Sequence, residues 1–256
     1  MPSRVPAASR ALRVLSYLAT QPEPVPLALI ARAMEMPRSS AYHVVNVMVA
    51  EGFVTHVEDE HRYGLGVAAF EVGSGYTRQA PLQRLARRPL AELVDDVGES
   101  GHLAALHGVD VLYLLEERAV GRPSLVTDVG VRLPAHLTAS GRAILSRLST
   151  SQVRALFSHQ AVFVSRQSGG PTSLSGLNSL LAETRQRGYA TEEGDVTAGL
   201  SSIAVPVVDP AGLPLAAVAV TYETDTLACL PGVVRRVTST AETLTHRIGG
   251  RWSKTR

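Results

Sequence analysis

The stretch MPRSSAYHVVNVMVAEGFV, residues 36–54, most constrains the fold, because it combines a helix start, an apolar face and a helix stop in a short span. Pro37 suits a first helical turn, and Gly52 suits the position just after the last turn. Between them, apolar residues recur at helical spacing: Ala41, Val44, Val45 and Met48. The pattern predicts an amphipathic helix whose other face stays in solvent.

Two more helices are predicted before this stretch and a hairpin after it. In SRALRVLSYLA, leucines recur at helical spacing behind Ser9, which can cap the first turn: Leu12, Leu15 and Leu18. The prolines of QPEPVP end that helix, and LALIARAMEM predicts a second one, with four residues facing inward: Leu27, Ile30, Ala31 and Met34. GFVTHVEDEHRYGLG then indicates two strands, residues 53–57 and 61–65, joined by an acidic turn. Three helices and a hairpin make a winged helix-turn-helix, which we assign to residues 1–66.

The rest of the chain predicts a linker helix and a larger domain. VAAFEVGSGYTRQA is a helical pattern weakened by glycines, and we assign residues 67–80 to a connecting helix. PLQRLARRPLAELVDDVG predicts an amphipathic helix that Pro89 should kink. Beyond it, HLAALHGVDVLYLLEE and AVPVVDPAGLPLAAVAV indicate antiparallel hairpins that alternate with helices. We therefore expect an α+β domain over residues 81–250, followed by a tail, residues 251–256.

The composition is that of an ordinary soluble protein. The chain has 256 residues, 45% of them hydrophobic, and a net charge of +2, which alone would not identify a nucleic-acid binder. No stretch approaches the roughly 20 apolar residues that span a bilayer, and the start MPSRVPAASR lacks the apolar core of a secretory signal, so we expect a cytoplasmic protein without a membrane partner. Cys229 is the only cysteine, and its apolar neighbours favour a small buried hydrophobe over a catalytic thiol. We expect neither a metal nor a cofactor.

The polar face of the helix in residues 36–54 is the candidate DNA contact. The second helix of a helix-turn-helix enters the major groove, and its N-terminal residues reach base edges and phosphates. Arginine can bond guanine or phosphate, hydroxyls suit phosphate, and asparagine can pair with adenine. The residues placed to do so are Arg38, Ser39, Ser40, Tyr42, His43 and Asn46. In the hairpin we favour Arg62 over the acidic tip, residues 58–60, which phosphates would repel. The alternative is a solvated helix face that binds nothing.

The chain resembles the IclR-type family of bacterial transcriptional regulators, and the resemblance runs from about Arg10 to the last predicted helix. The matching elements are RALRVLSYLA, RSSAYHVVNVMVAEGFV with RYGLG, GVRLPAHLTASGRAIL, RQRGYATEEGDVTAGLSSIAVPV and PLAAVAVTYE. The resemblance implies a winged helix-turn-helix that dimerises near its N-terminus, a linker helix, and a GAF-like domain that binds a small organic effector. It also implies a dimer or a dimer of dimers on a partly palindromic operator in double-stranded DNA, more often as a repressor.

The resemblance also places an effector pocket in the second domain. Backbone N–H groups before a helix correspond to Ala139 and Ser140 in LTASGRA, which suits a carboxylate or another polar oxygen, although Thr138 or Ser140 could simply cap that helix. Further family pocket positions fall on Leu125, Glu192, Ser202, Ala219 and Thr221. Glu192 replaces a shorter Asp, Ser202 replaces a frequent Cys, and Ala219 offers no side-chain bond. His43 stands where an arginine is common. A different effector and a different operator are therefore expected.

Two alternatives to an effector-controlled regulator stay open at the level of residues. A pocket holding Glu192, His136 and Ser140 could be described as hydrolytic, but TASGR and GLSSI each lack a glycine of the nucleophile elbow G-x-S-x-G. His102 and His107 lie in a strand-like run, not at the helical spacing of a zinc protease, and we interpret them as one rim and one core histidine. The second alternative is a DNA-binding module without an effector, whose second domain serves assembly only. Polar residues converging from distant segments favour a binding cavity instead.

Overall fold

The chain folds into two compact units, Met1–Ala80 and Pro81–Arg256. The computed structural model describes residues 5–79, 81–122, 125–159, 163–167, 169–224 and 230–251, so Cys229 lies outside the described residues. Within these ranges, no helix combines the length and the hydropathy needed to cross a bilayer.

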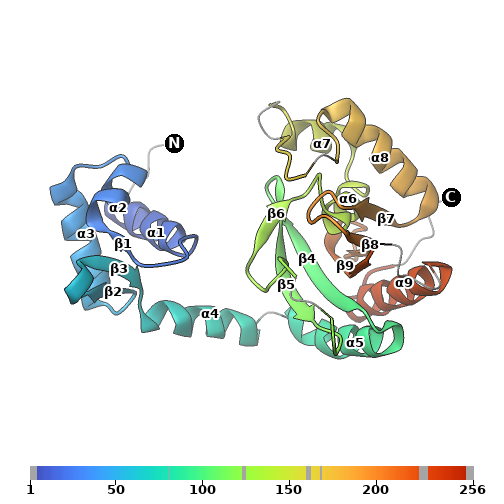
Figure 1. Cartoon of the computed structure of the whole chain (residues 1–256), viewed down its shortest axis with the longest axis horizontal. Coiled ribbons are helices and arrows are strands. Elements are labelled where there is room, and N and C mark those ends of the chain that lie inside the picture. Colours follow the sequence, from blue (N-terminus) through green and yellow to red (C-terminus); the bar gives the residue numbers. More distant parts are fainter. Residues whose placement is uncertain are drawn as a thin grey trace. The chain divides into compact units, whose positions relative to one another are not determined.

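Three helices pack together in the first unit, beside a small antiparallel sheet (Figure 1): α1 (Pro6–Leu18), α2 (Leu27–Ala33) and α3 (Arg38–Ala50). A fourth helix, α4 (Val67–Gln79), follows the sheet. The strands of the sheet are β1 (Val25–Pro26), β2 (Val54–Val57) and β3 (Arg62–Leu65), with a 3-10 turn, Glu58–Glu60, between β2 and β3. The predicted hairpin is confirmed, and the structure adds β1, which pairs with β3 through Val25 and Pro26.

The helix-turn-helix core follows the predicted apolar faces of α2 and α3. Leu27, Ile30 and Ala31 are buried from α2, and Ala41, Val45 and Met48 from α3. Gly52 has φ +74°, a left-handed conformation that suits glycine after a helix. The stop of the central helix is therefore confirmed, whereas Pro37 lies directly before the first turn, which begins at Arg38, and not within it.

The prediction for α1 was wrong in two respects. The helix begins at Pro6, so Ser9 lies inside it and does not cap it; the residue before the helix, Val5, provides no side-chain cap either. Leu12 is 65% exposed, whereas Val14 and Leu18, four residues apart, are buried. Proline suits a first helical turn, and the inward face is chosen by contact with the other helices rather than by the leucine spacing.

The second unit is an α+β domain with an antiparallel sheet, as predicted. The sheet has six strands in the order β6-β5-β4-β9-β8-β7, of which β6 and β7 were not predicted. The strands are β4 (Ser100–His107), β5 (Asp110–Glu117), β6 (Arg132–Pro134), β7 (Ala190–Glu193), β8 (Leu200–Val208) and β9 (Pro214–Glu223). The helices are α5 (Pro81–Val97), α6 (Ala139–Leu145), α7 (Thr150–Leu156), α8 (Leu174–Arg187) and α9 (Leu230–Arg247). The two predicted hairpins, β4-β5 and β8-β9, are joined in mid-sheet because β4 pairs with β9.

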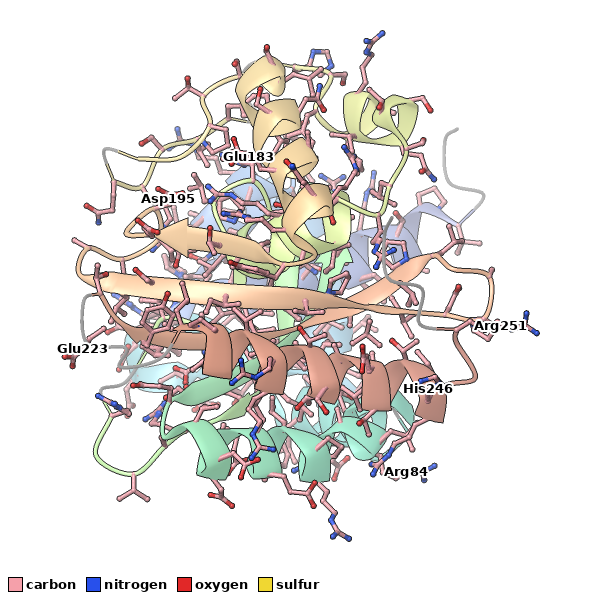
Figure 2. All side chains as sticks on the ribbon, turned by 90° about the vertical axis from the view of Figure 1, so that its right-hand side faces the viewer. Arg84, Glu183, Asp195, Glu223, His246 and Arg251 are labelled. Atoms are coloured by element: carbon pink, nitrogen blue, oxygen red, sulfur yellow. The ribbon has the colours of Figure 1, made fainter. Side chains whose placement is uncertain are left out.

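Helices cover both faces of this sheet (Figures 1 and 2). α5 and α9 lie on one face, and α6, α7 and α8 on the other. Successive residues of a strand point to opposite faces of the sheet, so each strand contributes to both cores. On β8, Ile203, Val205 and Val207 belong to the core under α5 and α9, whereas Ala204 belongs to the core under α6, α7 and α8. The α6 face carries polar side chains from the same strands, and the candidate pocket lies there.

Candidate functional sites

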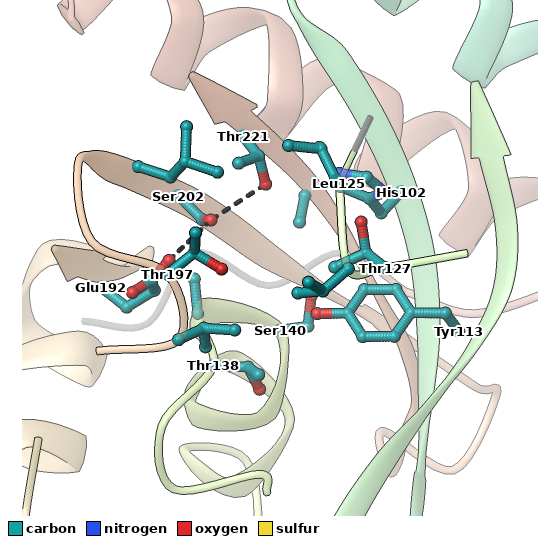
Figure 3. A pocket seen from close by; sticks show the side chains of 15 residues that line it. His102, Tyr113, Leu125, Thr127, Thr138, Ser140, Glu192, Thr197, Ser202 and Thr221 are labelled. Atoms are coloured by element: carbon teal, nitrogen blue, oxygen red, sulfur yellow. Dashed lines mark hydrogen bonds between the residues drawn. The ribbon is translucent and has the colours of Figure 1, made fainter. Parts of the chain in front are cut away.

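The floor of the pocket begins with a row of polar side chains across three strands. Glu192 on β7 is paired with Ser202 on β8, and Ser202 with Thr221 on β9. Ser202 Oγ donates to Glu192 Oε1 at 2.9 Å and lies 2.9 Å from Thr221 Oγ1. Because paired residues in an antiparallel sheet share a face, the three side chains form one connected network (Figure 3).

The next row on the same face is built from small residues and ends in a histidine. Ala190, Ala204 and Ala219 are paired in turn, and Ala219 is paired with His102 on β4. Ala190 and Ala204 belong to the core beneath α6 and α8, whereas Ala219 and His102 line the pocket. The polar row of the floor is therefore continued by an alanine and a histidine.

The start of α6 roofs this floor, and two features fix its position. Thr138 Oγ1 accepts a hydrogen bond from Gly141 N at 3.0 Å, so the capping alternative is correct for Thr138. A Cβ at Gly141 would overlap the backbone of Ala135, so only glycine permits this approach. The N–H groups of Ala139 and Ser140 open the helix and have no acceptor within it.

A buried ion pair ties α6 to the end of β7. Arg142 donates to the carbonyl oxygens of His136 at 2.9 Å and Thr191 at 2.8 Å, and it pairs with the carboxylate of Asp195. Asp195 N in turn donates to Glu192 Oε2 at 3.1 Å. The guanidinium thereby positions both the roof and the carboxyl group of the floor.

The enclosed space is narrow. The cavity volume is about 20 Å³, which is little more than one water molecule requires. No arginine or lysine lines it among the described residues. The lining residues are His102, Tyr113, Leu125, Val126, Thr127, Thr138, Ala139, Ser140, Glu192, Val196, Thr197, Leu200, Ser202, Ala219 and Thr221.

Burial sets the charge state of the pocket. It raises the pKa of Glu192 to about 7, although the bonds from Ser202 and Asp195 N favour the ionised form. Burial, with the nearby Glu192, also raises the pKa of the Tyr113 hydroxyl. Near neutral pH the Glu192 carboxyl therefore carries a proton in a large share of molecules and can donate it in a hydrogen bond.

All the effector positions suggested by the resemblance line this one pocket, together with Ala219: Leu125, Ala139, Ser140, Glu192, Ser202 and Thr221. His136, the third member of the hydrolytic alternative, does not. Its Nε2 lies 2.9 Å from the Val164 carbonyl oxygen, and its ring packs edge-on against Phe157 and Phe163. His102 and His107 were interpreted as one rim and one core histidine. His102 is buried and lines the pocket, and it was not predicted as a site residue.

A second hollow, of about 690 Å³, lies on the first unit beside the exposed face of α3. From α3 it is lined by Arg38, Ser39, Tyr42 and His43, all exposed. Ser40 is half-buried, and Asn46 is exposed one turn further along. The other lining residues come from the start of α2 and from the hairpin, and they were not predicted from the sequence. They are Pro26, Leu27, Ala28, His56, Glu60, His61 and Tyr63.

Arg62 is less free than the sequence suggested. Its guanidinium donates to the Pro24 carbonyl oxygen at 3.1 Å and lies 3.5 Å from the carboxylate of Glu60 and 4.0 Å from that of Glu23. It thus neutralises part of the acidic turn and holds β3 to the segment before α2. A phosphate would have to compete with these partners.

Comparison with known proteins assigns both units. Residues 7–58 match the model of the IclR helix-turn-helix domain, and residues 74–246 match that of the bacterial transcriptional regulator IclR C-terminal domain. The chain belongs to the IclR family. Family members of this kind are transcriptional regulators rather than enzymes, so the chain is a DNA-binding regulator and the hydrolytic alternative is set aside.

Individual IclR-type proteins agree with this assignment. The acetate operon repressor of Salmonella typhimurium is 27% identical over 219 residues, covering 85% of this chain and 80% of that protein. The glycerol operon regulatory protein of Streptomyces coelicolor is 28% identical and covers 92% and 91%. A crystal structure of an IclR transcriptional regulator from Silicibacter sp. TM1040 superposes with a TM-score of 0.82 at 28% identity, over 96% of this chain and 98% of that one.

Proposed function

We propose that the chain is a repressor whose binding to operator DNA is controlled by a small organic acid or a similarly polar metabolite. The observation that carries the proposal is the network of Glu192, Ser202 and Thr221 facing the first N–H groups of α6 across an enclosed space. A protonated Glu192 and free N–H groups can all donate to a carboxylate, which compensates for the absence of a cationic side chain among the described lining residues.

The narrow interior means that an effector must move a wall. Leu125, Val126 and Thr127 line the pocket but belong to no strand of the sheet, and we assign the movement to these three residues. The effector would shift the operator equilibrium only if it binds one arrangement of the protein more tightly than the other. We propose that the two arrangements differ in the spacing between the winged helix-turn-helix domains of two protomers. A linker formed by residues 67–80 would transmit the change from the pocket to these domains.

On the DNA side, we propose that α3 enters the major groove and that the protein acts in the cytoplasm as a dimer, or a dimer of dimers, on a partly palindromic site. The contact residues are those of the exposed face and one from the hairpin: Arg38, Ser39, Ser40, Tyr42, His43, Asn46 and Arg62. The exposed guanidinium and hydroxyl of Arg38 and Ser39 at the start of α3, and the exposed amide of Asn46 further along it, support this choice.

The test is a selection from fragmented genomic DNA followed by mobility shift over a salt series, with unrelated DNA as competitor. A salt-dependent and sequence-selective shift is expected. The selected site then permits an effector screen, in which Glu192→Ala and Ser202→Ala should abolish the response to a ligand that alters wild-type binding. A response that survives both substitutions would contradict the pocket assignment.

A further inference from the structure

The pocket contains two buried side chains whose polar atoms the rest of the protein does not use. His102 on β4 is 1% exposed, and Thr127, between β5 and β6, is 7% exposed. Among the described residues, neither ring nitrogen of His102 has a hydrogen-bond partner, and the Thr127 hydroxyl has none either. Buried polar groups nearly always have partners, because leaving one unpaired is destabilising. Two such groups lining one cavity indicate that a ligand supplies the missing bonds.

The neighbours of His102 explain why the protein itself cannot satisfy the imidazole. Its cross-strand partner on β9 is Ala219, whose methyl group cannot form a hydrogen bond. Its partner on β5 is Glu116, whose carboxylate accepts a hydrogen bond from Arg118 instead. The Tyr113 ring lies edge-on at 5.7 Å between centroids and presents no polar atom of the ring to the imidazole. In Figure 3, His102, Thr127 and Tyr113 lie toward one side of the pocket, and Glu192 toward the other. The unused polar atoms therefore form an end of the pocket distinct from the carboxyl end.

The charge state of His102 narrows the kind of group that fits. Burial, and to a lesser degree the positive charge of Arg118, lowers the pKa of His102 to about 4, so the ring is neutral at physiological pH. A neutral imidazole has one donor and one acceptor, and the Thr127 hydroxyl can also do both. A carboxylate can bond the two side chains only by accepting from both, and an ammonium only by donating to both. A hydroxyl group is a donor and an acceptor at one atom, so it can bond both side chains whichever ring nitrogen of His102 carries the proton.

We propose that His102 and Thr127 form a subsite for a hydroxyl group of the effector, at the opposite end of the pocket from Glu192. The effector is accordingly a hydroxylated organic acid, with its carboxyl group toward Glu192 and α6 and its alcohol or phenol group toward His102. This proposal rests on the proposed function for the carboxyl end, and it adds the chemical class of the ligand.

The test uses matched pairs of acids on the purified full-length chain. Each pair consists of a straight-chain monocarboxylate of three to six carbons, or benzoate, and the same acid with a hydroxyl group on the carbon farthest from the carboxyl. Dissociation constants are measured by calorimetry and thermal shift. For at least one pair, wild-type protein should bind the hydroxylated acid at least tenfold more tightly than its parent, because the parent leaves buried polar groups unpaired.

Two substitutions assign that preference to the subsite. Thr127→Val keeps the shape and removes only the hydroxyl, and His102→Leu removes both nitrogens; each should reduce the preference to about twofold or less. His136→Leu is the matched control, because His136 is also buried but bonds Val164 and does not line the pocket, so it should keep the wild-type ratio. Circular dichroism verifies folding, and Thr127→Val keeps the test valid if His102→Leu does not fold.

Several results would overturn the subsite. These are equal binding of both members of every pair, no binding of any hydroxylated acid, or a preference that survives both substitutions. Failure of the proposed function has a different signature: the acids bind with the expected preference, but operator affinity does not change. The selective mobility shift is measured without any acid, so DNA binding is judged separately from both.

Discussion

Replacing the buried carboxyl group of Glu192 by an amide should change how the stability of the protein depends on pH. Glu192 is 5% exposed, and its pKa rises from an ordinary 4.5 to about 7 in the folded protein. The folded state therefore holds a proton that the unfolded chain has released between these values. The free energy of unfolding therefore falls as pH rises from about 4.5 to about 7. Above pH 7 the contribution of Glu192 no longer changes with pH.

The magnitude follows from the shift. Each pKa unit corresponds to about 1.4 kcal/mol, so the shift costs the wild-type protein about 3 kcal/mol once pH exceeds the folded pKa. Glu192→Gln has no such cost. It also loses the acceptor for Asp195 N, worth about 1 kcal/mol, but that loss does not vary with pH. The variant should therefore gain about 2 to 3 kcal/mol relative to wild type between pH 5 and pH 8.5.

Urea unfolding followed by circular dichroism at several pH values measures this difference. The matched control is Glu193→Gln, which neutralises an exposed carboxyl on the next residue of β7 and should alter stability by less than about 0.5 kcal/mol at every pH. A difference between Glu192→Gln and wild type that stays flat across the range would show that Glu192 ionises normally, and the reasoning about a proton-donating pocket would fail.

Other predictions address DNA reading, the roof of the pocket and effector binding. Arg38→Ala should weaken operator binding by about 1 to 3 kcal/mol in mobility shifts, with relaxed sequence preference if Arg38 contacts a base, or a smaller salt dependence if it contacts a phosphate. Gly141→Ala should destabilise the protein and abolish the effector response because its Cβ would overlap Ala135, whereas Gly176→Ala, at the same position of α8 with its nearest contact at 3.5 Å, should be neutral or stabilising in thermal melts. Asp195→Asn should cost about 3 to 5 kcal/mol in urea unfolding, since it leaves a buried guanidinium without its counter-charge. Calorimetric titrations should show carboxylate binding weaken about tenfold per pH unit above pH 7, as Glu192 loses its proton.

The local elements of this fold could be predicted from the sequence because their signals are local. Pro37 and Gly52 bracket α3, and strand alternation with short turns marks both hairpins of the second unit. The two-residue strand β1 and the polar strand β7, sequence ATEE, carry no apolar pattern and were missed. Leu12 shows the related difficulty, since helical spacing cannot say which face meets the rest of the bundle.

The pocket shows where sequence reasoning ends. The carboxyl end could be located only through the family resemblance, because the pairing that aligns Glu192 with Ser202 and Thr221 joins segments far apart in the chain. His102 reaches the pocket through the pairing of β4 with β9, which links residues more than a hundred positions apart and has no local signal. Whether its nitrogens have partners depends on the completed packing, which no residue pattern specifies.

In this IclR-type regulator, we expect occupation of the effector pocket to change operator binding. The dissociation constant for the selected operator is measured by mobility shift with and without the hydroxylated acid that binds most tightly. The acid should change operator affinity at least tenfold in wild-type protein and leave it unchanged in the Glu192→Ala variant. Operator affinity that stays constant in wild-type protein, at an acid concentration shown by calorimetry to saturate it, would show that the pocket does not control DNA binding.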